Sequence, residues 1–476
     1  MERITVGALA SVIGGRPREG DDSGALVGPR VVIDSREAGD GALFVALPGE
    51  RTDGHAFVGA AAAAGAGAAL VAHPVEADLP QVIVEDPLAG LAALARTVVD
   101  AGRARGLRVI GVTGSSGKTS TKDLISQVLG AFGPTVAPPG SFNNEIGAPL
   151  TACRVDATTR YLVSEMGARG PGHIAALTAI TPPDVGAVLN VGSAHLGEFG
   201  SVEGIAAAKG ELVEALDADG WAVLNADDPQ VAAMASRTTA RLALVSARGE
   251  PDAGALRVWA SGVTADDTQR HAFTLHAAGQ VCGSAPVSLR VLGAHNVSNA
   301  VAAAACALAL GLPLAGVADA LSAAGPVSRW RMELARRADG LTIVNDAYNA
   351  NPDSMSAALH SLHGLRRAGG RLVAVLGDML ELGEDAVAAH RATGALAAGL
   401  GIDELWATGE FAGALTGGFA DSGGGRHHQG SKEEIVRLLA PALGPADVVL
   451  VKASRGLALE TVADALAAPD DEGARA

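Results

Sequence analysis

A glycine-rich turn between an apolar run and a helical pattern constrains the fold of this chain more than any other feature. Residues 111–120 read G-V-T-G-S-S-G-K-T-S and directly follow the mostly apolar run at 107–110. The segment after the turn has an apolar stripe made by Leu124, Ile125, Val128, Leu129 and Phe132. This pattern predicts a buried strand, a tight turn and a helix that opens with Lys118 and Thr119.

The turn has the chemistry of a phosphate-binding loop. Its glycines let consecutive backbone N–H groups point at one phosphate, and the helix N-terminus adds partial positive charge. Lys118 is expected to reach the outer phosphates, and the Thr119 hydroxyl to hold Mg²⁺. The alternative, a chance Lys-Thr pair after a glycine turn, leaves the strand and the helix unexplained. We therefore predict a nucleoside triphosphate site at Thr113, Gly114, Ser115, Ser116, Gly117, Lys118, Thr119 and Ser120.

This loop departs from the common motif G-x-x-x-x-G-K-[ST]. Val112 stands where that motif has its first glycine, and Gly114 is the nearest glycine before Gly117. The shorter spacing narrows the family of nucleotide-binding proteins to which the chain can belong. The loop predicts that a nucleotide binds, but it does not reveal the reaction.

Composition excludes several classes of function. The formal net charge is −16 and no basic block offsets it, so we expect neither a nucleic-acid partner nor an anionic membrane surface. Three cysteines without paired spacing argue against a disulfide framework or a zinc site. The first residues show no signal-peptide core, and the apolar stretch at 300–312 is too short to span a bilayer. We expect a cytoplasmic protein without membrane insertion.

The alternation of strand-like and helix-like runs predicts an α/β protein with three domains. We expect a small α/β N-terminal domain at 1–105, a central P-loop domain with a parallel sheet at 106–326 and a C-terminal Rossmann-like α/β domain at 327–476. The first boundary follows a polar connection at 101–106. Predicted strands lie at 31–33, 42–46, 160–164, 185–191, 221–225, 341–345, 372–376, 404–407 and 448–451.

Three further segments have distinctive composition. The alanine-rich residues 60–69 are expected to form a helix. The glycine-rich residues 417–430 are expected to form a flexible loop, in which His427 and His428 are solvated. The charged tail at 469–476 is expected to fray.

Three polar residues of the central domain are candidates for the nucleotide site. Glu165 follows a predicted strand, where P-loop folds often place an acidic residue that supports the metal. His195 follows the next strand, and ligands bind where the carboxyl ends of parallel strands meet. Lys209 lies in a helical pattern at 201–216. The alternative for each is a solvated side chain, and the sequence pattern alone favours that reading for Lys209.

The chain after residue 290 contains further polar clusters. Asn296 and Asn299 lie one helical turn apart and can either contact an adenine edge or cap a helix. The run R-W-R at 329–331 offers guanidinium groups for phosphate contact. The residues 346–354, D-A-Y-N-A-N-P-D-S, follow a predicted strand and are either a ligand site or a helix start.

Taken together, these motifs resemble the Mur ligases, the ATP-dependent enzymes that build the peptide of peptidoglycan. The resemblance covers nearly the whole chain. It rests on D-S-R at 34–36, L-F-V-A-L-P-G at 43–49, the short P-loop, S-F-N-N-E-I-G at 141–147, residues 190–195, 208–209 and 293–299, N-D-A-Y-N-A-N-P-D-S at 345–354 and G-D-M-L-E-L-G at 377–383. Within the family these motifs are similar to those of the member that uses D-alanyl-D-alanine. The D-N-P-R motif of the diaminopimelate-adding member is missing.

The resemblance implies an activity. The expected reaction joins D-alanyl-D-alanine to UDP-N-acetylmuramoyl-tripeptide through an acyl phosphate, with ATP and Mg²⁺ as cofactors and the chain acting as a monomer. It implies that Lys118 stabilises the transferred phosphoryl group, that Thr119 and Glu165 hold one Mg²⁺ and that His195 lies at a second. Lys209 matches a lysine that this family carbamylates, which makes it a third catalytic candidate beside Lys118 and His195.

The resemblance also assigns ligand contacts. Asn299, Arg331 and Asp346 match positions that contact adenine, phosphate and ribose, with Arg329 as the alternative to Arg331. Substrate contacts are expected at Ser35, Arg36, Asn143, Asn144, Asn349 and Asn351. Two other functions remain open, namely a related amide ligase with a different acceptor and a regulatory protein that binds nucleotide without ligation.

Overall fold

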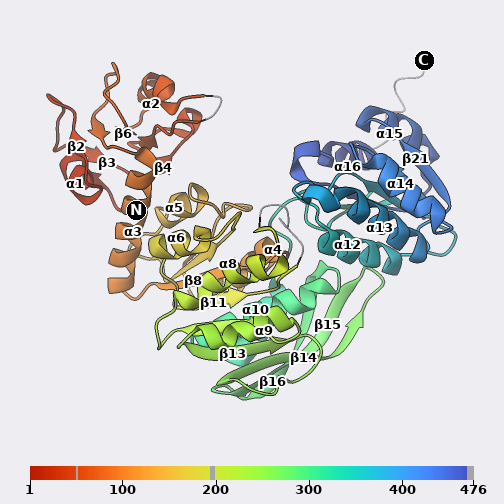
Figure 1. Cartoon of the computed structure of the whole chain (residues 1–476). Helices are drawn as coiled ribbons and strands as arrows, with labels where there is room; N and C mark the ends of the chain where they lie inside the picture. Colours follow the sequence, from red (N-terminus) through yellow and green to blue (C-terminus); the bar gives the residue numbers. More distant parts are fainter. Residues whose placement is uncertain (50–51, 193–198, 469–476) are drawn as a thin grey trace.

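The computed structural model describes residues 1–49, 52–192 and 199–468, which form three α/β domains (Figure 1). The N-terminal and C-terminal domains lie on either side of the central domain, and each domain has its own main β-sheet. This arrangement confirms the predicted fold class, while the exact boundaries near 105 and 326 stay predictions. Among the described helices, none combines the length and the apolar character needed to cross a bilayer.

The N-terminal domain has a five-stranded sheet in the order β2-β7-β6-β5-β4, in which only the β2–β7 pair is antiparallel. The helix expected at 60–69 is wrong in its second half, because Gly65 takes φ +96° and the chain then enters a buried strand. The polar connection expected at 101–106 is also wrong at its start, because helix α3 continues to Ala104. The elements are β1 (Ile4–Thr5), α1 (Val6–Val12), β2 (Arg16–Pro17), β3 (Leu26–Val27), β4 (Val31–Val32), η1 (Ser35–Glu37), β5 (Leu43–Val45), η2 (Gly54–Phe57), α2 (Val58–Ala63), β6 (Ala68–Val71), β7 (Gln81–Ile83) and α3 (Pro87–Ala104).

The central domain has a nine-stranded sheet in the order β16-β15-β14-β13-β12-β11-β8-β10-β9. The strands from β9 to β14 in this order run parallel, as the sequence predicts. Beyond β13 the sheet is extended by three long strands, β14 to β16, which were not predicted; β14 is parallel to β13, and the β14–β15 and β15–β16 pairs are antiparallel. The strands are β8 (Arg108–Thr113), β9 (Thr135–Val136), β10 (Tyr161–Glu165), β11 (Val185–Val188), β12 (Trp221–Asn225), β13 (Arg241–Ser246), β14 (Leu256–Ala265), β15 (Arg270–Gly279) and β16 (Gly283–Leu292).

Helices pack against both faces of this sheet. The apolar stretch at 300–312 falls mainly in α10, which packs against α4 and against strands β12 to β14. Its alanines are buried there, so the stretch is a core helix. The helices are α4 (Lys118–Gly130), α5 (Gly147–Ala152), α6 (His173–Ile180), α8 (Val202–Glu214), α9 (Pro229–Ala233), η3 (Met234–Arg237), α10 (His295–Ala309) and α11 (Leu314–Ala323).

The C-terminal domain has a six-stranded sheet in the order β17-β18-β22-β19-β20-β21, with only the β17–β18 pair antiparallel. The loop expected at 417–430 is wrong, because buried Leu415 and Phe419 anchor helix α14 and the chain then adds edge strand β21. The elements are β17 (Glu333–Arg336), β18 (Thr342–Asn345), α12 (Pro352–Gly364), β19 (Leu372–Leu376), η4 (Gly383–Asp385), α13 (Ala386–Gly399), β20 (Glu404–Ala407), α14 (Ala412–Asp421), β21 (Arg426–Gln429), α15 (Lys432–Leu439), η5 (Ala440–Ala442), β22 (Val448–Lys452), η6 (Arg455–Leu457) and α16 (Glu460–Ala467).

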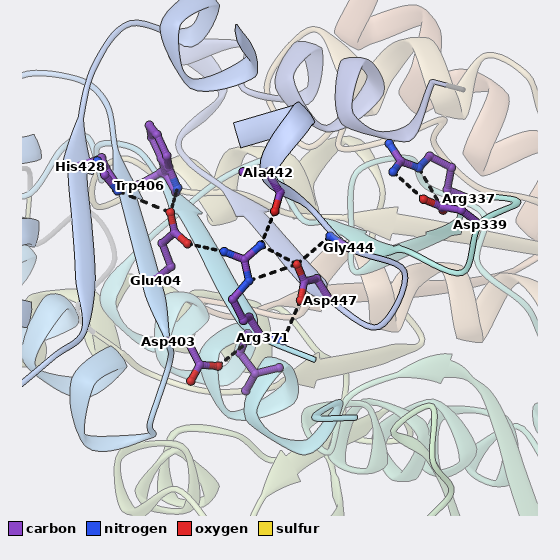
Figure 2. Close-up of polar contacts among 11 residues, drawn as sticks. Arg337, Asp339, Arg371, Asp403, Glu404, Trp406, His428, Ala442, Gly444 and Asp447 are labelled. Carbon is purple, nitrogen blue, oxygen red and sulfur yellow. Dashed lines mark hydrogen bonds and ion pairs between the residues drawn. The ribbon is translucent and has the colours of Figure 1, made fainter. Parts of the chain in front are cut away.

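Arg371 joins two buried carboxylates at the amino ends of β19, β20 and β22 (Figure 2). It donates from Nη1 to Glu404 Oε2 at 2.9 Å and from Nη2 to Asp447 Oδ2 at 2.7 Å. Burial alone would raise the pKa of Asp447, but the guanidinium and two backbone N–H groups hold it below its usual value. Glu404 also accepts from Trp406 Nε1, whose ring stacks on exposed His428. The cluster therefore fastens the sheet at the edge opposite the carboxyl ends of its parallel strands.

Replacing Arg371 by methionine is expected to lower the free energy of unfolding by about 2–3 kcal/mol, because two buried carboxylates lose their partner. The Asp447 carboxylate contributes to this stability above the unfolded Asp pKa of about 3.9, and its contribution is lost as pH falls through the lower folded pKa of Asp447. Urea unfolding at pH 7 and below pH 4 measures the difference, which should shrink in acid. The control is Arg391→Met, whose pair with Asp421 is exposed and worth at most about 0.5 kcal/mol. Equal losses in the two variants would contradict the prediction.

Candidate functional site

A cavity of about 1100 Å³ opens where the strand ends of the central and C-terminal domains meet. The P-loop, the end of β10 and helix α8 line it from the central domain. Loops after β18, β19 and β22 line it from the C-terminal domain, and Ile33 lines it from the N-terminal domain. Because ligands of parallel α/β sheets bind outside the carboxyl ends of the strands, this cavity is the candidate active site.

The phosphate-binding loop has the predicted strand–turn–helix form. It connects β8 to α4, and Gly117 caps the helix with φ +77°, a conformation that favours glycine. Residues 115–120 line the cavity, while Thr113 ends β8 behind them. Lys118 Nζ donates to the carbonyl of Gly114 at 2.7 Å, and burial lowers the pKa of Lys118 although the Glu165 carboxylate opposes this.

Asn190 fixes the shape of this loop. Its Oδ1 accepts from the Ser116 N–H at 2.9 Å, its Nδ2 donates to the Ser116 carbonyl at 3.2 Å and its own carbonyl accepts from Ser115 N–H. The residue follows β11, so a neighbouring strand holds the loop that β8 carries. Asn190 was part of a motif in the sequence, but its individual contact with the loop was not predicted.

Glu165 carries an oxygen that is suited to a metal ion. Its Oε1 accepts from Asn143 Nδ2 at 2.8 Å and from Thr119 Oγ1 at 3.2 Å. Its Oε2 is buried and has no hydrogen-bond partner among the described residues. A buried carboxylate oxygen without a partner is costly unless a cation binds it, and carboxylate and hydroxyl oxygens suit Mg²⁺. Thr119 and Glu165 therefore fit the predicted magnesium site.

Lys209 lies on α8 and lines the same cavity with only 3% of its surface exposed. Burial, together with the charge of Lys118, lowers its pKa to about 7. Near neutral pH, Lys209 is then an uncharged amine in a large fraction of the molecules, and the uncharged amine is the form that reacts with carbon dioxide. His195 lies outside the described residues, so its predicted place beside this cluster stays a prediction.

Asn296 and Asn299 form a buried pair at the start of α10. Asn296 Nδ2 donates to the carbonyl of Leu292 at 2.7 Å, and Asn299 Nδ2 donates to Asn296 Oδ1 at 2.8 Å. Neither side chain caps the helix, whose N-cap is Ala294, so the capping alternative is wrong. Asn299 borders the cavity beside Gly117, where a Cβ atom would lie 2.7 Å from Asn299 Oδ1.

Arg331 enters the cavity from the segment that links the central and C-terminal domains. Its Nη2 donates to Ser141 Oγ at 2.8 Å, and Ser141 Oγ also lies 2.6 Å from Thr119 Oγ1. Its guanidinium stacks on the ring of Tyr348, with 4.2 Å to the centroid. Arg329 lies instead over the ring of Trp330 and is not part of the cavity wall as described. The position of Arg331 therefore favours it over Arg329 as the arginine that contacts phosphate.

Asp346 has a partner that the sequence did not reveal. Its Oδ2 accepts from Lys452 Nζ at 2.6 Å, and its Oδ1 accepts from Met332 N–H at 3.0 Å. Lys452 is 2% exposed at the end of β22 and also donates to the carbonyl of Asn349. An acidic residue and a lysine from two strands thus share one place at the cavity wall.

The segment 349–354 serves as a helix start, as the alternative interpretation proposed. Asn351 caps α12 in a reciprocal arrangement with Ser354, and Asn349 Oδ1 accepts from the next N–H. Both asparagines also line the cavity, so their contact with a substrate stays a prediction. In the motif at 377–383, Asp378 accepts from the N–H groups of Glu410 and Phe411, and residues 380–382 line the cavity.

The remaining substrate candidates separate into two groups. Asn143 and Asn144 line the cavity, and Asn144 Oδ1 accepts from Gly147 N–H at the start of α5. Ser35 and Arg36 lie in the N-terminal domain outside the described cavity wall, and Arg36 pairs with Asp34 in solvent. Ile33 is the residue of that segment which reaches the cavity.

Comparisons with known proteins agree with this architecture. Residues 30–99, 112–307 and 330–455 match the family models described as Mur ligase family, catalytic domain; Mur ligase middle domain; and Mur ligase, glutamate ligase domain. The UDP-N-acetylmuramoyl-tripeptide–D-alanyl-D-alanine ligase of Mycobacterium tuberculosis strain H37Rv is 46% identical, with 99% of each chain covered. Crystal structure I of MurF from Acinetobacter baumannii superposes with a TM-score of 0.87 at 32% identity and covers 98% of this chain and 99% of that one. MurF from Thermotoga maritima in complex with ADP gives 0.76 at 29% identity, with 92% and 97% covered.

Proposed function

This chain belongs to the Mur ligase family, and we propose that it is the ADP-forming ligase that joins D-alanyl-D-alanine to UDP-N-acetylmuramoyl-tripeptide. The observation that carries the proposal is one cavity lined by a phosphate-binding loop, a buried carboxylate with a free oxygen and a buried lysine. The full-length similarity to enzymes of that name selects this reaction among the ligases. The product is a peptidoglycan precursor made in the cytoplasm.

In the first step, the terminal carboxylate of the tripeptide attacks the γ-phosphorus of ATP. The bond between this phosphorus and the β–γ bridging oxygen breaks, ADP leaves and an acyl phosphate forms. Lys118 and the N–H groups at the start of α4 neutralise the charge of the transferred phosphoryl group. Asn190 holds the loop in the required shape before the substrate arrives.

In the second step, the amine of D-alanyl-D-alanine attacks the acyl carbon. The resulting tetrahedral intermediate collapses, the bond from carbon to the phosphate oxygen breaks and phosphate leaves while the nitrogen loses a proton. Arg331 reaches the P-loop through Ser141, so it can contact the phosphates from the side of the C-terminal domain. We assign adenine to Asn299 and ribose to Asp346, whose carboxylate has lone pairs left beside Lys452.

A magnesium ion would be held by Thr119 and Glu165, with His195 near a second ion. When bound, such ions neutralise phosphate charge and orient the leaving group. Lys209 would carry a carbamate, because its lowered pKa supplies neutral amine and a carboxylate-like group suits Mg²⁺ better than an ammonium. The free Oε2 of Glu165 supports the metal assignment from this chain itself.

We further propose that the enzyme works as a monomer in the cytoplasm. All three domains that border the cavity come from one chain, so a second copy is not needed to complete it. The free cysteines Cys153, Cys282 and Cys306 are compatible with a reducing compartment.

The test is release of ADP and phosphate with the purified chain and three substrates. We expect turnover that requires UDP-N-acetylmuramoyl-tripeptide and D-alanyl-D-alanine together, with the UDP-pentapeptide found by mass spectrometry. ATP turnover with a single amino acid and none with the dipeptide would instead identify a related amide ligase. Nucleotide binding without any acceptor-dependent turnover would identify a regulatory protein.

A further inference from the structure

The proposed acceptor has a carboxylate that the site described so far does not bind. D-alanyl-D-alanine brings an amine on its first residue, which must be uncharged to react, and a terminal carboxylate on its second residue. A carboxylate that enters a cavity loses hydration and needs a cation or several N–H donors. This requirement rests on the proposed function and concerns the end of the dipeptide that does not react.

Six cationic side chains line the cavity within the described part of the chain. They are Lys118, Arg169, Lys209, Arg331, Lys452 and Arg455. Lys118 and Lys209 belong to the proposed phosphate and metal sites. Arg331 donates to Ser141 beside the P-loop. Lys452 is buried, and its ammonium already donates to the Asp346 carboxylate and to the Asn349 carbonyl. Two guanidinium groups remain for a carboxylate, one on the central domain and one on the C-terminal domain.

Arg455 is held in a fixed orientation with one edge unused. Its Nη1 donates to Glu460 Oε1 at 2.5 Å, and its guanidinium stacks on Trp330 with 4.3 Å to the ring centroid. Its Nε and Nη2 have no hydrogen-bond partner among the described residues. Those two donors form the side edge of the guanidinium, which matches the two oxygens of a carboxylate.

The position of Arg455 also fits the acceptor. It opens η6, three residues after the end of β22, and shares the C-terminal wall of the cavity with Asn349, Asn351 and residues 380–382. Arg169 lies on the opposite domain, after β10 and beside α6, on the wall that also carries the apolar side chain of Phe142. We expect the UDP-linked tripeptide to approach the P-loop from the N-terminal domain, past Ile33. The C-terminal wall of the cavity is then left for the dipeptide acceptor.

We infer that Arg455 binds the terminal carboxylate of D-alanyl-D-alanine through its Nε–Nη2 edge and thereby selects a free dipeptide as acceptor. Glu460 and Trp330 position the guanidinium before the substrate binds, which lowers the cost of ordering it. The residue acts on specificity and has no part in phosphoryl transfer.

The test compares D-alanyl-D-alanine with D-alanyl-D-alaninamide, which keeps the amine but lacks the terminal charge. For the unmodified enzyme, kcat/KM is expected to be about 10- to 100-fold lower for the amide. In Arg455→Gln, kcat/KM for D-alanyl-D-alanine should fall by about the same factor. Its kcat/KM for the amide should stay close to that of the unmodified enzyme, and its KM for ATP should not change. Arg455→Lys, which keeps the charge without the fork, should lie between the two.

Two matched variants separate binding from packing. Arg329→Gln removes the other guanidinium that stacks on Trp330 and should keep the full discrimination between acid and amide. Arg169→Gln should keep it as well, whatever it does to the UDP-linked substrate. Equal use of acid and amide by the unmodified enzyme overturns the inference even if Arg455→Gln does not fold. Loss of discrimination in Arg169→Gln but not in Arg455→Gln also overturns it. An enzyme that uses neither dipeptide refutes the proposed function instead.

Discussion

Replacing Lys209 by alanine is expected to lower kcat for ligation by about 100-fold or more, because the metal cluster loses its carbamate support. The fold should remain, since an ammonium at this buried position costs free energy and its removal relieves that cost. Turnover with saturating substrates and thermal unfolding measure the two effects separately. Lys432→Ala is the control, because Lys432 begins α15, donates to the Leu457 carbonyl of η6 and does not line the cavity as described. Full activity in Lys209→Ala would refute the carbamate assignment.

If Lys209 carries a carbamate, the activity of the enzyme should depend on carbon dioxide and on pH. Carbamate forms from the neutral amine and CO₂ with release of a proton, and the neutral fraction rises as pH increases through about 7. Enzyme stripped of CO₂ should therefore regain activity on addition of bicarbonate, and the regained fraction should be larger at pH 8 than at pH 6. Acetate or formate should partly restore Lys209→Ala, which leaves room for a carboxylate, but not Lys209→Met. Activity that is independent of CO₂ at both pH values would contradict this prediction.

The parts of the fold that were predictable have contiguous signals. The P-loop joins a strand, a turn and a helix within a short run, and the strands at 221–225, 372–376 and 404–407 coincide with their apolar runs. A prediction based on apolar runs misses strands β14 to β16, because their buried residues alternate with less buried ones such as Arg257, Thr274 and Ser288. That alternation is the pattern of a strand with one buried face. The glycine-rich composition of residues 417–430 predicts a loop, but the first part of this segment is helical. Tertiary packing of Phe419 there overrides the local composition.

The candidate site divides in the same way. Lys118 and Thr119 are predictable from the phosphate-binding loop and Glu165 from the end of a strand, whereas other contacts of the site join distant segments. Lys452 lies 106 positions from Asp346 in the chain, and Arg331 lies 190 positions from Ser141. One sequence contains no signal for such pairs, because the chain topology alone brings them together. The lowered pKa of Lys209 likewise depends on burial that the helical pattern does not reveal.

Replacing Glu165 by glutamine is expected to lower kcat/KM by about 100- to 1000-fold, because a neutral amide binds Mg²⁺ poorly. Glutamine keeps an oxygen that can accept from Asn143 and Thr119, so the local hydrogen bonds survive. It also removes a buried carboxylate oxygen that has no partner within the described part of the chain. We therefore expect the thermal unfolding midpoint of the free variant to equal or exceed that of the unmodified chain.

This opposition between activity and stability distinguishes a metal ligand from a structural carboxylate. A structural role predicts that activity and unfolding midpoint fall together, whereas a metal role predicts loss of activity without loss of stability. A titration with Mg²⁺ at fixed ATP gives an independent reading, since half-maximal activity of Glu165→Gln should need a higher Mg²⁺ concentration. Glu214→Gln, at an exposed carboxylate that pairs with half-buried Arg237 on the same domain, should leave all three measurements unchanged. An unaltered Mg²⁺ dependence in Glu165→Gln would assign the free Oε2 to some purpose other than metal binding.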